Sequence, residues 1–132
     1  MPELLERGGS INLWSEWSLT LPPSHYQRND DGSWSAWGAD WVVDVTIIDV
    51  GGDPDGKPVP AEALLGGKQP NASGSGWIGH TEVLTEKDGD RDVFRLTASL
   101  ASTNTLMSCC VSYLSQPQHG LANALVQSVA HK

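Results

Sequence analysis

Alternating apolar and polar residues predict a strand in the first part of the chain. Trp17, Leu19 and Leu21 recur at every second position of residues 12–21, and Pro22-Pro23 follows at once. Successive side chains of a strand point to opposite faces, so the three apolar residues would share one face. We therefore expect a half-buried strand that ends before the two prolines.

A longer apolar stretch over residues 33–50 predicts a second strand. In an unbroken strand, Trp37 and Trp41 would lie on the same face as Val43, and Trp34 would not. Both faces of residues 41–48 are rather apolar. This pattern is typical of a central strand that is covered, at least in part, on each face.

Three more strands are expected in the second half. Residues 81–85 and 93–100 flank Asp88-Gly89, a strong signal for a tight hairpin. Residues 106–114 alternate again, with Cys109 on an apolar face.

Helices are predicted at three places. Residues 3–7 could form one helical turn, and residues 60–65 a short helix between Pro60 and Gly66-Gly67. After Pro117 the apolar period changes to four, which predicts a terminal helix. The glycine-rich residues 69–76 read as a loop.

These elements predict one α+β domain over residues 1–132. A length of 132 residues is typical of one domain with one core. Strands joined by tight turns favour a single antiparallel β-sheet. The short middle helix and the C-terminal helix would pack on that sheet.

Charge narrows the classes of partner. The chain has 8 basic and 16 acidic residues, a net charge of −8. Nucleic acids and anionic membranes need a basic face, so neither is expected, and no apolar run is long enough for insertion into a membrane. The N-terminus lacks a secretory pattern, and the adjacent Cys109 and Cys110 are expected to be free thiols. We expect a cytoplasmic protein.

No sequence motif predicts catalysis or a cofactor. Residues 51–57 match the spacing of a phosphate loop, but Pro58 stands where a hydroxyl residue is needed. From Gly51 to Glu62 the spacing partly matches a calcium loop, although Gly51 has no carboxylate for the first ligand position. Calcium binding by this loop stays open. The four histidines lack the spacing of zinc ligands.

Tryptophan is the most unusual feature of the composition, with six residues. The pattern W-S-x-W occurs at residues 14–17 and 34–37. The cytokine-receptor box of this form belongs to a disulfide-bearing sandwich, which this chain cannot form. In a strand the two rings would lie on opposite faces, so Trp14 and Trp34 are predicted to face outward. Alternatively, these rings lie beneath the helices.

The order of elements resembles the PsbP-like fold, which includes DcrB-like and Eag-type chaperone proteins. The resemblance includes residues 17–22, a strand ending in Leu-Pro, and residues 40–50, the long strand. It extends to the short helix, the Asp88-Gly89 hairpin and the closing helix. It implies an adaptor, accessory or chaperone-like role and assigns no functional residue.

The expected function is therefore protein binding without catalysis, as an adaptor, chaperone-like or immunity-type module. Trp14, Trp34 and Asp40 are the predicted contact residues, on an acidic surface that holds a basic protein or a second copy of the chain. The alternative is a small-molecule site or small enzyme with a pocket near Trp77 and His80, under the loop at residues 69–76.

Overall fold

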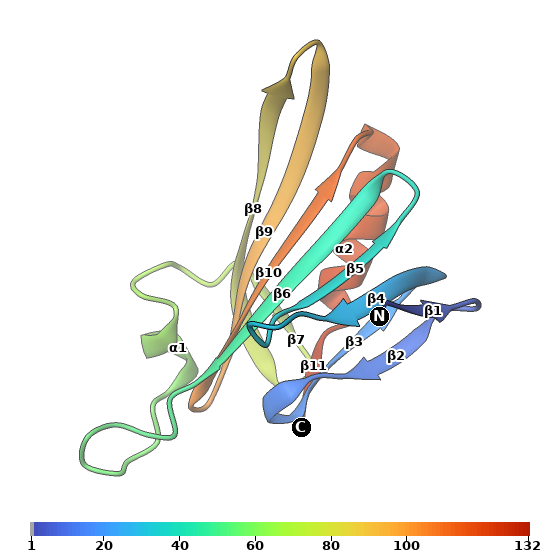
Figure 1. Ribbon diagram of the computed structural model, residues 1–132. Helices are drawn as coiled ribbons and strands as arrows, with labels where there is room; N and C mark the ends of the chain where they lie inside the picture. Colours follow the sequence, from blue (N-terminus) through green and yellow to red (C-terminus); the bar gives the residue numbers. More distant parts are fainter. Residues whose placement is uncertain (1) are drawn as a thin grey trace.

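The computed structural model describes residues 2–132 and is built mostly of β-strands (Figure 1). The strands are β1 (Glu3–Leu5), β2 (Gly9–Asn12), β3 (Trp17–Leu21), β4 (Ser24–Arg28), β5 (Trp34–Gly38), β6 (Trp41–Asp49), β7 (Ala72–Gly74), β8 (Trp77–Asp88), β9 (Arg91–Ser102), β10 (Thr105–Tyr113) and β11 (Ala130–His131). Two α-helices, α1 (Ala61–Leu64) and α2 (His119–Gln127), and two short 3-10 turns, η1 (Trp14–Glu16) and η2 (Gln116–Gln118), complete it.

The strands form two sheets. Eight make an antiparallel sheet in the order β1-β4-β5-β6-β10-β9-β8-β7, and three make a small sheet in the order β11-β3-β2. Helix α2 and the small sheet lie on one face of the large sheet (Figure 1). We call this the inner face and the opposite one the outer face.

The core lies between these two layers. Trp17, Leu19 and Leu21 of β3 are buried, as their spacing predicted. Helix α2 contributes a buried stripe with Leu125 and Val126, and the inner face of the large sheet closes the core. Burial of this stripe explains why so short a helix is stable, since a helix of its length is marginal by itself.

The predicted fold class is wrong. The chain has two sheets, so it is neither one sheet covered by helices nor an α+β sandwich. Residues 3–7 do not form a helical turn, because residues 3–5 pair with β4 as an edge strand. Residues 12–21 are not one strand either: the chain turns at η1, and β2 and β3 form a hairpin. The short middle helix, the terminal helix and the Asp88-Gly89 hairpin are confirmed.

Residues 33–50 also form a hairpin instead of one strand. The chain reverses at Ala39-Asp40, and Trp37 pairs with Val42. This reversal changes which residues share a face. Trp34 therefore lies opposite Val45 on the inner face, whereas Trp37 faces outward, the reverse of the predicted arrangement.

The outer face is covered only at one end. Helix α1 contacts β8, β9 and β10 there, and Ala101 beneath it is fully buried. Elsewhere on this face Val42 and Ile48 are exposed, so β6 is central but not covered on both faces. Among residues 2–132, no helix has the length and hydrophobicity needed to cross a membrane.

Candidate functional site

An apolar groove of about 300 Å³ lies beside the turn between β5 and β6. The turn has a tight geometry. Asp40 adopts a positive φ of 65°, which aspartate tolerates better than most residues. A Cβ at Gly38 would lie 2.5 Å from Nε1 of Trp41, so only glycine fits there without a shift. This turn directs Trp37 outward.

Four strands contribute to the groove. Its lining consists of Trp37, Gly38, Asp40, Trp41, Val42, Val93, Ser112, Tyr113 and Leu114. Strand pairing explains how they meet, because Trp37 pairs with Val42 and Val42 with Ser112. The lining is mainly apolar, and Asp40 is its one charged member.

Trp37 is the central side chain of this surface. Its ring stacks on His25, with 5.8 Å between ring centroids and 12° between ring planes. Together with His25 it also borders a second hollow, of about 460 Å³, which Leu4 and Pro23 line as well. Leu4 is largely exposed. The half-buried indole therefore separates two neighbouring apolar concavities.

Carboxylates lie beside the groove on the outer face, among serine and threonine side chains. Asp44 lies two residues beyond Val42 and accepts a hydrogen bond from Ser35 Oγ at 2.8 Å. Glu86 forms an ion pair with Arg95, at 3.5 Å, so the charge of this arginine is already balanced. The groove is therefore apolar, with negative charge from Asp40 and Asp44 around it.

The three predicted contact residues do not form one surface. Trp14 is 55% exposed on η1, as predicted, but it lines a separate hollow of about 190 Å³ with Arg28 and Asp31. Trp34 packs against the core from the inner face. Only Asp40 lies in the groove.

The sequence prediction missed Trp37. An unbroken strand over residues 33–50 would place Trp37 on the buried face with Val43. The signal that could have located the turn is Gly38 followed closely by an aspartate, a combination that supplies both small size and a tolerated positive φ.

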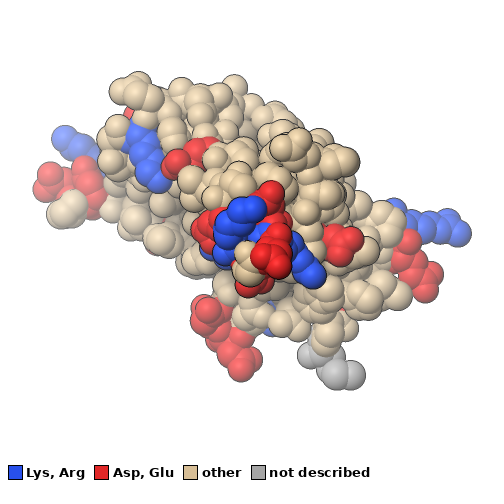
Figure 2. Space-filling model, turned by 90° about the horizontal axis from the view of Figure 1, so that it is seen from above, with Lys and Arg blue, Asp and Glu red and all other residues tan. Residues whose placement is uncertain are grey.

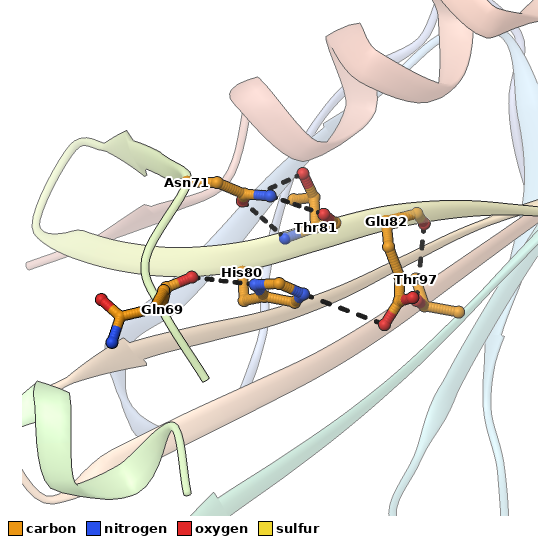
Figure 3. A network of polar contacts seen from close by, with 6 residues as sticks. All are labelled: Gln69, Asn71, His80, Thr81, Glu82 and Thr97. Carbon is orange, nitrogen blue, oxygen red and sulfur yellow. Dashed lines mark hydrogen bonds and ion pairs between the residues drawn. The ribbon is translucent and has the colours of Figure 1, made fainter. Parts of the chain in front are cut away.

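The residues of the alternative site, Trp77 and His80, do not point into one common space. Trp77 is buried, and its indole N–H donates to the Val129 carbonyl at 2.7 Å. His80 lies three residues further along β8 and therefore on the opposite face. Its ring contacts Gln69 O through Nδ1, at 2.8 Å, and Glu82 through Nε2, at 3.8 Å (Figure 3).

The thiols and the 51–62 loop offer no reactive group at the groove. Cys109 is fully buried, and this burial raises the pKa of its thiol to about 12. In the loop, Asp53 Oδ1 accepts the backbone N–H groups of Asp55 and Lys57, so this carboxylate stabilises a turn. Within residues 2–132, no three carboxylate, histidine or cysteine side chains gather in a way that could hold a metal ion.

Comparison with known proteins identifies a likeness of fold. No protein-family model matches the chain, a PsbP-like one included, and no curated protein matches it. A crystal structure at 1.50 Å resolution from Bacteroides thetaiotaomicron VPI-5482 is similar, with a TM-score of 0.72 and 8% sequence identity. The match covers 96% of this chain and 49% of the other, so the chain spans about half of that protein's length. At this identity the similarity concerns the fold alone.

Proposed function

We propose that this chain is a protein-binding module without catalytic activity of its own. It holds its partner in the groove around Trp37, on the outer face of the large sheet. The groove of about 300 Å³ at Trp37 carries this proposal. Tryptophan is enriched among the residues that contribute most to binding, because its ring combines a large apolar area with a polar tip.

The charges around the groove favour a basic partner. Asp40 lines the groove and Asp44 lies nearby on the same face, while Arg95 is paired with Glu86. An apolar side chain with a lysine or arginine next to it would fill the groove and place its charge near Asp40. Such complementarity speeds encounter and suppresses acidic competitors.

The proposal predicts that a short basic-apolar peptide binds at Trp37. The probe is the labelled peptide Lys-Leu-Pro-Leu-Lys, whose proline removes one backbone N–H and so disfavours its addition to a sheet edge. Trp37→Ala should weaken its binding about thirtyfold, the equivalent of a loss of about 2 kcal/mol at a central contact. Asp40→Asn should weaken it less. Fluorescence anisotropy measures both.

Trp14→Ala is the matched control, since it removes another accessible tryptophan outside the groove. This variant should bind as the unmodified chain does. Equal losses in Trp14→Ala and Trp37→Ala, or equal binding of Glu-Leu-Pro-Leu-Glu, would contradict the proposal. A second copy of the chain is the other possible occupant of the groove, and sedimentation velocity tests it. If the unmodified chain forms a dimer and the Trp37→Ala variant does not, the groove binds a second copy of the chain.

A further inference from the structure

Strand β8 has a long open edge. Strand β7 pairs with only its first three residues, Trp77–Gly79. From His80 to Asp88 the only strand beside β8 in the described chain is β9. The β8–β9 hairpin projects beyond the rest of the sheet, which leaves this edge accessible (Figure 1).

Asn71 forms hydrogen bonds with the first residues of that edge. Its backbone N–H donates to Gly79 O at 2.9 Å. Its side-chain amide then accepts the N–H of Thr81, at 2.8 Å, and donates to Thr81 O, at 2.7 Å (Figure 3). A side-chain amide has the same donor and acceptor as a peptide group, so Asn71 takes the place of one further strand residue.

Beyond Thr81 the outward backbone groups have no such partner. The pairing of β8 with β9 continues without a bulge from Ile78 to Asp88. Backbone groups alternate in direction along a strand, and those of Thr81 point away from β9. Those of Val83, Thr85 and Lys87 therefore point the same way, and no strand or side chain among residues 2–132 pairs with them.

The side chains along this edge favour an added strand. Val83 is 48% exposed and Leu84 43% exposed, on opposite faces of the sheet. Glu82 and Glu86 lie on either side of Leu84 on the outer face. An exposed edge with apolar side chains is a template for pairing with another chain.

We propose that residues 82–87 bind an extended segment of a protein partner as an additional antiparallel strand. Lysine or arginine would lie opposite Glu82 and Glu86, the second of which shares its carboxylate with Arg95 at 3.5 Å, and an apolar residue would lie opposite Leu84. Cross-strand pairs of opposite charge and of apolar residues both stabilise a sheet, and the backbone hydrogen bonds supply the rest of the affinity.

A second copy of this chain fits the edge poorly. In antiparallel pairing, outward-pointing residues must face outward-pointing residues, so few registers exist. A register centred on Leu84 places Glu82 against Glu86, and one centred on Thr85 places Glu82 against Asp88. One centred on Val83 reaches Thr81, whose backbone Asn71 already occupies. Like charges directly opposite are destabilising, which favours a basic foreign strand.

This edge does not depend on the groove at Trp37, and the two can be tested separately. The edge probe is the labelled peptide Thr-Lys-Thr-Val-Thr-Lys-Thr, measured by fluorescence anisotropy. Thr85→Pro removes an outward N–H and places a ring on the edge while sparing the bonds to β9. It should weaken binding at least tenfold. Thr85→Ala, which keeps the N–H, should bind within about twofold of the unmodified chain.

Two further measurements keep the result decisive if Thr85→Pro disturbs the hairpin. The double variant Glu82→Lys with Glu86→Lys should no longer bind the lysine peptide. It should instead bind a version of the peptide that has glutamates in place of the lysines. In the unmodified chain, the lysine peptide should slow amide hydrogen exchange at Val83, Thr85 and Lys87. Equal binding of both peptides by the unmodified chain, or unchanged exchange at these amides, would overturn the proposal. Trp37→Ala should leave edge binding intact.

Discussion

Five of the six tryptophans of this chain fall into three kinds of environment, and the sixth, Trp41, is buried beside the groove. Trp17 and Trp77 are buried and connect the layers of the molecule. The Trp17 indole donates to Thr105 Oγ1, at 2.9 Å, and the Trp77 indole to the Val129 carbonyl. Trp34 Nε1 is buried and has no hydrogen-bond partner among residues 2–132. Its indole N–H is therefore less well satisfied than those of Trp17 and Trp77. Trp37 and Trp14 remain accessible for binding.

Cys109 should make the stability of the chain pH-dependent. Burial keeps its thiol protonated up to a pKa of about 12, whereas an unfolded thiol ionises near pH 8.5 to 9. Between these values the unfolded state has lost a proton that the native state keeps. The free energy of unfolding should therefore be fully maintained below about pH 8.5 and fall at higher pH, by at most about 1.4 kcal/mol per pH unit.

Urea unfolding midpoints at pH 8 and pH 10 test this expectation. Burial also raises the pKa of Tyr113, which adds to the loss above pH 10. Cys109→Ala should be less stable at both pH values and should lose less stability between them. An unchanged pH dependence in Cys109→Ala would show that another group is responsible.

At the scale of the elements, periodicity predicted the strands with one buried face. The spacing in β3, in β10 and in helix α2 identified buried residues such as Leu19, Val111 and Leu125. It failed at the turns. Ser15, Glu16 and Asp40 adopt positive φ although none is glycine, so the hairpins at η1 and between β5 and β6 carry no Asn-Gly or Asp-Gly signal.

Of the two missed turns, the one between β5 and β6 had the larger effect on the predicted faces. A two-residue turn reverses the chain, so every later face assignment relative to Trp34 changed. The predicted helical turn at residues 3–7 failed for another reason. A segment that short does not sustain a helix alone, and the free edge of β4 offers it backbone partners instead.

Gly38→Ala should destabilise the hairpin between β5 and β6. The added Cβ would lie 2.5 Å from the buried Trp41 ring, which must then move. Overpacking of this kind costs about 1–3 kcal/mol. Chemical denaturation measures the loss, and we expect peptide binding in the groove to fall with it.

Gly120→Ala is the contrasting substitution. A Cβ at Gly120 meets nothing within 4 Å, and alanine is the better helix former. This variant of α2 should be unchanged or more stable by up to about 1 kcal/mol. If both variants lose the same stability, the contact with Trp41 is not the cause at Gly38.

At the scale of the whole molecule, charge should act on the rate of binding. The net charge is −8, and the tip of the β8–β9 hairpin carries intermixed ion pairs, such as Lys87 with Asp92 at 2.7 Å (Figure 2). Paired charges contribute little to long-range attraction, so the excess carboxylates elsewhere determine encounter with a basic partner.

Salt should therefore slow association of the proline-containing lysine peptide with the groove. The Debye length shortens to about 10 Å at 0.1 M salt, which screens the attraction before contact. Stopped-flow measurements should give an association rate constant that falls steeply with salt and a dissociation rate constant that changes little. A salt effect confined to dissociation would mean that charge acts only after docking.

The sequence predicted an acidic surface that bears tryptophan, but not where the groove lies. Its lining comes from β5, β6, β9 and β10, which are separated by up to several tens of residues along the chain. Only the strand order brings these segments together, and local periodicity contains no information on that order.

The small sheet joins β3, near the beginning of the chain, to β11, at its end. During synthesis on the ribosome, the large sheet can form before residues 130–131 have emerged, but the layer over its inner face cannot be completed. A nascent chain must then keep Met107 and Val111 out of contact with other nascent chains until β11 has emerged. The apolar interior is therefore closed only after β11 has joined β3, and the interval before this pairing is the stage at which a molecular chaperone would have most to protect.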